Sequence, residues 1–211
     1  ETIAHKLSEI LSGEVIKRVR VENHLLIYGG IVEEFEKTLV GRSFLSFRGD
    51  GKFLIMVLDS NTEIVINPML TGRIKLTSPS KRPGKHDVFR IMVSNQSLWY
   101  TDRKQMGRVY LVRNSDYSEV AEFEGRGPSA LNPELTLGVF RERINKHRGQ
   151  IKNVLCNQRF VKGIGNAYAD EILLYAGVLP FRKRSTLTDN EIERLYNAMR
   201  ALLTKFKEIL M

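Results

Sequence analysis

The sequence predicts an α+β protein in which a strand-rich first part precedes an all-helical second part. Apolar residues alternate with polar ones through much of residues 1–125, as half-buried strands require. From residue 135 onward they recur at helical spacing instead. Between these parts lies the segment EGRGPSALNPE, whose two glycines and two prolines are typical of a linker. We therefore expect domains at 1–125 and 135–211, joined by a linker at 126–134.

The first domain is expected to be an antiparallel β-sandwich or barrel-like sheet with a flanking helix. Apolar residues at helical spacing in the first eleven positions predict that helix. Strands are predicted in EVIKRVRVE, KFLIMVLD, EIVINPML, DVFRIMVS, SLWYTD and GRVYLV. Turns are expected at Ser60-Asn61 and Asn95-Gln96, and a basic loop at 77–87. The single tryptophan, Trp99, is expected to be a core residue.

The second domain is expected to contain four helices. The first two are predicted in LTLGVFRERINKH and QIKNVLCNQ. The third follows Gly165-Asn166 and should stop near Gly177 and Pro180, which are helix-ending residues. The last helix should begin at a capping box formed by Thr188 and Glu191, and it carries a continuous apolar stripe.

The balance of charge indicates a polyanionic partner. The chain carries a formal net charge of +9, and its isoelectric point is near 9.7. Residues 1–125 hold 18 basic against 16 acidic residues, whereas residues 126–211 hold 15 against 8. The excess therefore lies in the helical part, which favours nucleic-acid binding there. We expect Arg182-Lys183-Arg184 to be a solvated loop; a further phosphate-binding patch is the alternative.

The sequence does not indicate a membrane-spanning protein or a disulfide-stabilised protein. No uncharged apolar run approaches the ~18–20 residues that span a bilayer, so we expect no membrane partner. The single cysteine, Cys156, excludes an internal disulfide and a multi-cysteine zinc site within this chain. We expect its side chain to be a small buried hydrophobe. A cytoplasmic, nucleoid-associated location is expected, or a nuclear one in a eukaryote.

The stretch Gly163-Ile164-Gly165-Asn166 directly precedes the predicted third helix. Glycines allow the backbone to approach another molecule closely, and Asn166 is expected to be the N-cap. A helix N-terminus is a ready anion site, and Arg159 and Lys162 add positive charge. The pattern predicts a turn that clamps a backbone phosphate. A plain connection between two helices uses the same residue types and is the alternative.

A family resemblance rests on this stretch and on its neighbours. The run NQRFVKGIGNAYADEILLYAGVLP resembles the helix–two-turn–helix signature of the formamidopyrimidine-DNA glycosylase / endonuclease VIII family. Five other segments resemble further motifs of that family, in order: ETIAHKL, FRGDGKFLIMVL, NPMLTGRI, TDRKQMGRVYL and RGPSAL. The resemblance implies base-excision repair of oxidised DNA bases by an N-glycosylase that also has apurinic/apyrimidinic lyase activity.

The resemblance also implies roles for individual basic and polar residues. Lys52 would contact the phosphate beside the flipped nucleotide and is the one catalytic-site candidate within the chain. Asn166, with the glycines at 163 and 165, would hold the phosphates that flank the lesion. Lys152 and Lys162 are further candidates for phosphate contacts. For the lysines, an ordinary solvated side chain is the alternative.

Three other residues would fill the space that a flipped base leaves. Leu70 takes the family's methionine position, Lys104 its arginine position and Met106 its phenylalanine position. Lysine cannot reproduce the planar fork of arginine, so the opposite-base preference is open. Core packing is the alternative for Leu70 and Met106. The family's histidine before this stretch is Asn67 here, which is another departure.

The nucleophile that the resemblance implies is an N-terminal proline next to a glutamate. The chain begins at Glu1, which aligns with the last glutamate of the family's N-terminal motif, so both groups would lie upstream. A four-cysteine finger holding one zinc would follow Met211; no cofactor is expected within the chain. We expect the sequence to be trimmed at both ends, and a natural non-cutting remnant is the alternative.

The implied partner is double-stranded DNA containing oxidised bases or abasic sites, bound by a monomer. The motifs favour oxidised purines over pyrimidines as the lesion. A second interpretation is a non-catalytic nucleic-acid-binding homologue that uses the same phosphate clamp.

Overall fold

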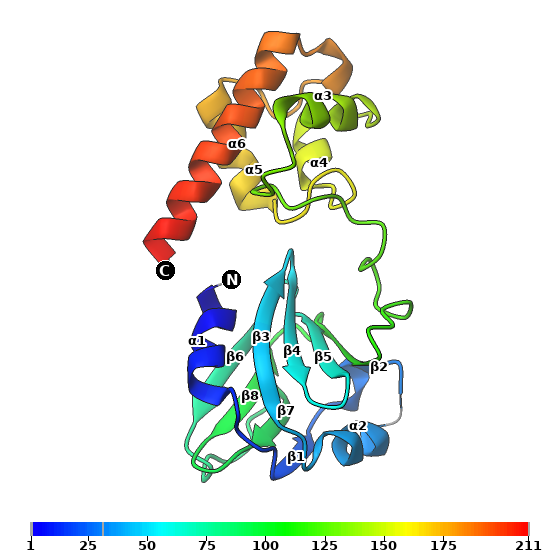
Figure 1. Cartoon of the computed structure of the whole chain (residues 1–211), viewed down its shortest axis with the longest axis vertical. Helices are drawn as coiled ribbons and strands as arrows, with labels where there is room; N and C mark the ends of the chain where they lie inside the picture. Colours follow the sequence, from blue (N-terminus) through cyan, green and yellow to red (C-terminus); the bar gives the residue numbers. More distant parts are fainter. Residues whose placement is uncertain (1, 31, 211) are drawn as a thin grey trace. The chain divides into compact units, whose positions relative to one another are not determined.

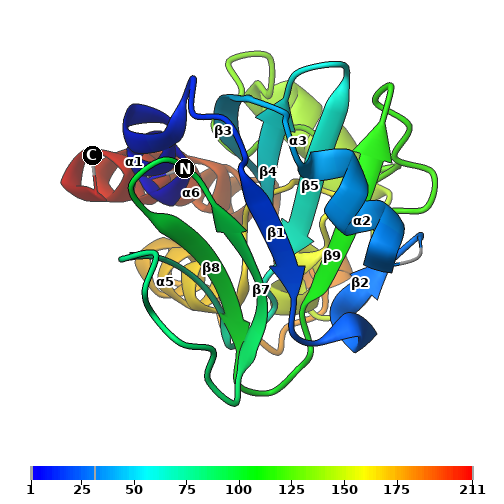
Figure 2. The same ribbon diagram turned by 90° about the horizontal axis from the view of Figure 1, so that it is seen from below.

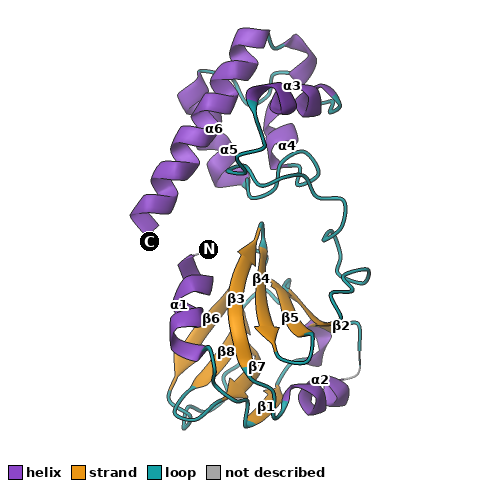
Figure 3. Ribbon diagram, viewed as in Figure 1, coloured by secondary structure: helices purple, strands orange, loops and turns teal. Residues whose placement is uncertain are grey.

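The computed structural model describes residues 2–30 and 32–210, which fold into two compact units that divide between residues 121 and 122. The first unit contains all the strands of the described residues, and the second is helical (Figures 1 and 3). The predicted α+β class is therefore confirmed. No helix in the described part of the chain is long and apolar enough to cross a bilayer.

The first unit is a sandwich of two sheets. Its elements are α1 (Thr2–Leu11), β1 (Arg18–Val21), the 3-10 helix η1 (His24–Leu26), β2 (Ile27–Tyr28), α2 (Val32–Leu39), β3 (Phe44–Asp50), β4 (Phe53–Leu58), β5 (Thr62–Asn67), β6 (Gly72–Thr77), β7 (Asp87–Met92), β8 (Ser97–Asp102) and β9 (Arg108–Arg113). One sheet has the order β1-β7-β8-β6 and the other β2-β9-β5-β4-β3. All pairs are antiparallel except β2 with β9.

The core of this unit lies between the two sheets. Strand β5 is buried at every position because it is central in its sheet. The predicted turn at Ser60-Asn61 joins β4 to β5, and both residues have φ near +50°, as the twist of a tight hairpin requires. Apolar and polar residues do not alternate clearly along β3. In the structure, an irregularity between Phe44 and Ser46 shifts the register of β3 against β4.

Trp99 is fully buried, but it lies on the face of its sheet that points away from the main core. Its neighbours Leu98 and Tyr100 belong to that core, and successive side chains of a strand point to opposite faces. The Trp99 ring lies beneath two cations instead. The Lys81 Nζ is 4.0 Å from the ring centroid, and the Arg90 guanidinium carbon is 5.3 Å from it.

The second unit is a helical bundle around its own core. Its elements are α3 (Leu137–Asn145), α4 (Ile151–Cys156), α5 (Asn166–Ala176), the 3-10 helix η2 (Arg184–Thr186) and α6 (Asp189–Leu210). Helix α5 packs against α6 and ends at Gly177, whose φ of +65° places it in the left-handed region. The predicted stop at Gly177 is confirmed.

The segment predicted as a linker, 126–134, packs onto the helical unit rather than running free. The Gly127 amide donates to the Gln158 carbonyl at 2.8 Å, and the Lys162 amide donates to the Pro128 carbonyl at 2.9 Å. Ala130 is buried in the helical core. Glycine allows this segment to approach the helical unit closely, and proline favours an extended backbone. A flexible linker is rich in the same two residues, so composition alone does not distinguish the two cases.

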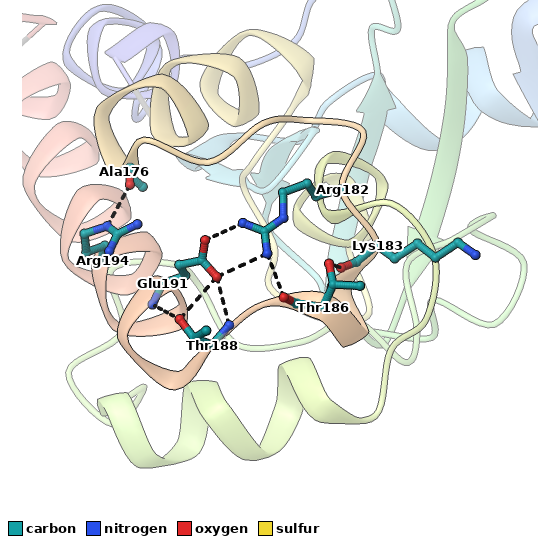
Figure 4. Close-up of polar contacts among 7 residues, drawn as sticks. All are labelled: Ala176, Arg182, Lys183, Thr186, Thr188, Glu191 and Arg194. Carbon is teal, nitrogen blue, oxygen red and sulfur yellow. Dashed lines mark hydrogen bonds and ion pairs between the residues drawn. The ribbon is translucent and has the colours of Figure 1, made fainter.

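The capping box predicted for the last helix is present (Figure 4). The Thr188 amide donates to Glu191 Oε2 at 2.8 Å, and the Glu191 amide donates to Thr188 Oγ1 at 3.3 Å. Arg182 forms an ion pair with Glu191 and donates to the Thr186 carbonyl at 2.6 Å. The prediction that the segment 182–184 is a solvated loop is therefore wrong for Arg182, which ties the loop to the start of α6. It is also wrong for Arg184, which begins the 3-10 helix η2 and whose Nε and Nη2 atoms are buried.

The contribution of Glu191 to the stability of the helical unit should depend on pH. The hydrogen bonds that Glu191 accepts from Arg182 and from the Thr188 amide lower the pKa of its carboxyl group to about 2. The stabilisation is present above the unfolded-state pKa, roughly 4.3, and is lost as pH falls toward 2. We expect Glu191→Gln to melt a few degrees below wild type at pH 7, with the difference shrinking below about pH 4. Melting followed by circular dichroism from pH 7 to 2.5 measures this.

The exposed Glu208, on the same helix, supplies the matched control for this prediction. Glu208→Gln should leave the melting temperature nearly unchanged at every pH. A difference between Glu191→Gln and wild type that stays constant down to pH 2.5 would contradict the assigned role of the Arg182 ion pair.

Candidate nucleic-acid interface

The turn between α4 and α5 is held by the side chain of Gln158. Its Nε2 donates to the carbonyls of Cys156 at 3.1 Å and of Ile164 at 2.8 Å. Its Oε1 accepts the Gly163 amide at 3.0 Å. Gly163 has a φ of +98°, which favours glycine. The sequence pattern does not single out Gln158, since nothing in it shows which polar side chain of a turn points inward.

Asn166 begins α5, and Gly165 is its N-cap. The prediction that Asn166 is the N-cap is wrong, because the extended Gly165 occupies that position one residue earlier. No side chain among the described residues caps the helix, and the Asn166 side chain is exposed. The first amides of a helix lack intrahelical partners and carry the positive end of its dipole. Asn166 therefore stands beside amides that an anion can bind.

The side chain of Cys156 lies next to that of Asn166, and it is less buried than the sequence predicts. Its side chain is half-buried rather than buried, and its Sγ is 3.6 Å from Asn166 Oδ1. Burial raises the pKa of the Cys156 thiol, so it is protonated at neutral pH. The thiol consequently acts as a weak donor that orients the Asn166 amide.

The lysines predicted at this turn differ in their surroundings. Lys152 Nζ forms an ion pair with Asp170 Oδ1 at 2.8 Å, so a phosphate would compete with this carboxylate for it. Lys162 is part of the turn itself, where its amide pairs with the segment at 126–134. Arg159 is exposed at the start of the turn.

The back of the turn is braced by Arg143 and Gly127. The Arg143 Nε donates to the Phe160 carbonyl at 2.9 Å, and its Nη2 donates to the Arg159 carbonyl at 2.7 Å. A Cβ on Gly127 would lie 2.3 Å from the Phe160 oxygen, so no larger residue fits there. These contacts hold the turn rigidly on the helical core.

In the first unit, strand register brings three predicted segments to one end of the five-stranded sheet. Leu54 pairs with Ile66, and Asn67 pairs with Arg108. Lys52 just before β4, the loop 68–71 after β5 and the loop 103–107 before β9 therefore share that end. We call them the Lys52 turn, the Leu70 loop and the Met106 loop. Lys52 follows Gly51, whose φ is +63°.

The Leu70 and Met106 loops are tied together by the fully buried carboxylate of Asp102. It accepts the Thr71 hydroxyl and the amides of Lys104 at 3.2 Å, Met106 at 2.9 Å and Gly107 at 2.6 Å. Thr71 Oγ1 in turn accepts the Lys104 amide at 3.0 Å. Burial opposes ionisation of Asp102, but these hydrogen bonds outweigh it and lower its pKa.

This carboxylate holds two large apolar side chains in solvent. Leu70 is 64% exposed and Met106 is 42% exposed, which excludes core packing for both. Lys104 is exposed on the same loop. Exposed apolar residues are common, but here each lies on a short loop fixed by a buried network. Nothing in the sequence pattern indicates this organising role for Asp102.

Two family models match the chain, and together they cover most of it. The formamidopyrimidine-DNA glycosylase N-terminal domain matches residues 1–109. The formamidopyrimidine-DNA glycosylase H2TH domain matches residues 126–208. The first match contains the Lys52 turn and both loops, and the second contains the turn before Asn166.

Similar proteins agree with these matches. The formamidopyrimidine-DNA glycosylase of Desulfitobacterium hafniense is 33% identical over 204 residues, which cover 94% of this chain and 73% of the relative. That of Thermus thermophilus is 29% identical over 209 residues, covering 99% and 74%.

Solved structures share the fold. The Lactococcus lactis formamidopyrimidine-DNA glycosylase bound non-covalently to DNA containing an AP site superposes with a TM-score of 0.92 at 23% identity, covering 99% of this chain and 80% of that one. The same enzyme with DNA containing a FAPY-dG lesion gives 0.90 at 24% identity, covering 97% and 77%. On the two family matches and the 33% identical relative, this chain belongs to the formamidopyrimidine-DNA glycosylase family.

Proposed function

We propose that this protein binds damaged duplex DNA, extrudes an oxidised base and acts as a bifunctional DNA glycosylase with apurinic/apyrimidinic lyase activity. The observation that carries this proposal is the pair of exposed apolar side chains, Leu70 and Met106, on loops locked by Asp102. The family membership and the DNA named for similar structures support it.

Extruding a base leaves a gap that must be filled. Unstacking costs a few kcal/mol, and apolar wedges between base steps recover part of that cost. Leu70 and Met106 have the size and exposure for this role, and their fixed loops reduce the entropy lost on binding. Lys104 beside them would donate to the unpaired base as a point charge.

The phosphate grip would come from the turn before α5 and from the Lys52 turn. At the former, the exposed Asn166 side chain and the first amides of α5 would donate to phosphate oxygens. Lys52 would contact the phosphate beside the flipped nucleotide. The rigid brace behind the turn favours tight binding because little order has to be gained.

In the proposed reaction an amine attacks C1′ of the lesion nucleotide, and the base leaves with the electron pair of the glycosidic bond and takes up the proton that the amine loses. The C1′–O4′ bond of the sugar then breaks, and the Schiff base formed at C1′ permits elimination of the neighbouring phosphates. The family resemblance assigns the amine to an N-terminal proline, which is not among these 211 residues. The residues of this chain would bind and orient the DNA.

We expect Asn166→Ala to weaken binding to a duplex containing a tetrahydrofuran abasic-site analogue by about tenfold, since a hydrogen bond to a charged group contributes roughly 1.5–3 kcal/mol. Fluorescence anisotropy measures the affinity, and circular dichroism verifies the fold. Asn190→Ala, an exposed asparagine on α6, is the matched control. Equal binding by Asn166→Ala and wild type would remove the phosphate-clamp assignment.

The enzymatic part is tested by borohydride trapping of the full-length gene product on abasic-site DNA. A covalent adduct is expected, because reduction fixes a Schiff base. Intact lesion binding without an adduct would overturn the lyase proposal and favour the second candidate, a non-catalytic DNA-binding homologue. That candidate is supported by the phosphate-clamp turn, which by itself requires only binding.

A further inference from the structure

The four-stranded sheet carries a row of cations across its outer face. Arg20 on β1 pairs with Arg90 on β7, Arg90 pairs with Trp99 on β8, and Trp99 pairs with Lys75 on β6. Directly paired residues point to the same face of a sheet, and Leu98 occupies the opposite, core face. Figure 2 shows β1, β7 and β8 side by side.

Two further arginines extend this row into a patch. Arg18 is two residues before Arg20, and Arg73 is two residues before Lys75, so both share its face. We define the outer-face patch as the five cations at positions 18, 20, 73, 75 and 90. Four of them are exposed and Arg90 is half-buried. On β6 the patch begins at Arg73, two residues after the Leu70 loop ends.

The charge of this patch is not neutralised by the protein. Within residues 2–30 and 32–210, no ion pair joins any of its five cations to a carboxylate. Like charges directly opposite on neighbouring strands, such as Arg20 and Arg90, repel one another. Three acidic residues lie at its margin. Asp87 at the start of β7 is paired with Lys81 at 3.4 Å, Glu22 follows β1, and Glu36 on α2 accepts the Val21 amide at 2.7 Å.

The partner that fits this face is a polyanion without an apolar component. Trp99 is fully buried beneath Lys81 and Arg90, so the face offers no exposed aromatic anchor of the kind that membrane-surface proteins use. Strands lie roughly 4.8 Å apart, so the row from β1 to β6 spans about 14 Å. A duplex carries about one negative charge per 1.7 Å of its axis, so this row meets several phosphates.

We propose that the outer-face patch is a second DNA-binding surface, which holds the phosphate backbone of undamaged duplex without reading its sequence. The choice of DNA as the polyanion rests on the proposed function, whereas the uncompensated charge does not. Such a surface would keep the protein on DNA between lesions, because phosphate contacts supply most non-specific affinity.

The test compares two charge-matched double variants on an undamaged 30-base-pair duplex. Arg20→Gln with Lys75→Gln should lower the slope of log K against log salt by about two and weaken binding about tenfold near 0.15 M salt. Lys6→Gln with Lys37→Gln removes two exposed lysines from α1 and α2 and should leave the slope near wild type. Identical slopes for the two double variants would overturn the proposal.

A second measurement locates the contact. Undamaged duplex should protect Lys75 from an amine-acylating reagent, read by mass spectrometry, but leave Lys6 and Lys37 reactive. Unprotected Lys75 would overturn the proposal, as would vesicles of anionic phospholipid binding through Arg20 and Lys75 while the DNA slope is unchanged. The Asn166→Ala variant separates this proposal from the proposed function. If that variant loses its preference for lesion duplex while undamaged duplex still protects Lys75, the patch binds DNA independently of the phosphate clamp. Failure of the proposed function would therefore appear in lesion binding, and failure of the patch in the protection of Lys75.

Discussion

Asp102→Asn is expected to destabilise the first unit by about 3 kcal/mol, because hydrogen bonds to a buried charged acceptor contribute roughly 1.5–3 kcal/mol and their donors would be left unpaired. The Asn amide would place its own donor against the amides of Met106 and Gly107. Preference for abasic-site duplex over undamaged duplex should fall to near unity, since both loops lose their fixed positions. Urea unfolding and anisotropy titrations measure the two effects.

The pH dependence of the stability difference between wild type and Asp102→Asn identifies the Asp102 carboxylate as its source. The native pKa of Asp102 is lowered, so its contribution is complete above the unfolded-state pKa, roughly 3.9, and is lost as pH falls through the native value. The stability difference between wild type and Asp102→Asn should therefore narrow below about pH 4. Glu22→Gln, at an exposed carboxylate after β1, is the control and should leave stability nearly unchanged at every pH. If Asp102→Asn still prefers abasic-site duplex as strongly as wild type does, Asp102 does not fix the positions of the Leu70 and Met106 loops.

Gly107→Ala is expected to destabilise the first unit by about 3 kcal/mol, the upper part of the range for overpacked cores. A Cβ at Gly107 would lie 1.9 Å from Tyr100 Oη and 3.0 Å from Asp102 Oδ2. The Tyr100 ring cannot move aside, because it is fully buried and packs against Phe89 at 5.7 Å between ring centroids. Thermal and urea unfolding report the loss.

Tyr100→Phe tests whether this hydroxyl is the cause. The Tyr100 hydroxyl is buried and has no hydrogen-bond partner among the described residues, and burial raises its pKa, so removing it should cost less than about 1 kcal/mol. In the Tyr100→Phe background, Gly107→Ala should cost at least about 1 kcal/mol less than in wild type. Gly138→Ala, at an open position in α3, should be neutral or stabilising. An unchanged cost in both backgrounds would place the strain elsewhere.

The helix ends show how far local patterns determine structure. The capping box at Thr188 and the stop at Gly177 were both predictable, because each depends on residues within one helical turn. The N-terminus of α5 was predicted one residue late. Glycine and asparagine both occur at N-caps, and only the packing of the turn around Gln158 decides which of them takes the position.

The site residues divide in the same way. Family motifs were sufficient to select Leu70, Lys104 and Met106 from the sequence. They did not reveal Asp102 as the group that connects their loops, because Thr71 and Met106 are far apart in the chain and meet only through strand pairing. Lys152 was a candidate phosphate contact from the sequence, and its ion-pair partner Asp170 becomes a neighbour only in the folded bundle.

Charge gives the clearest contrast between sequence and structure. The sequence by itself determined the fold class, the two-part organisation and the family, since these depend on periodicity and ordered motifs. It also placed the basic excess in the helical part, because the acidic residues of the first part nearly balance its basic ones. Only the tertiary structure decided that strand pairing gathers Arg20, Arg90 and Lys75 on one face of the four-stranded sheet. Net charge adds over a chain, whereas an electrostatic surface depends on which side of a sheet each residue faces.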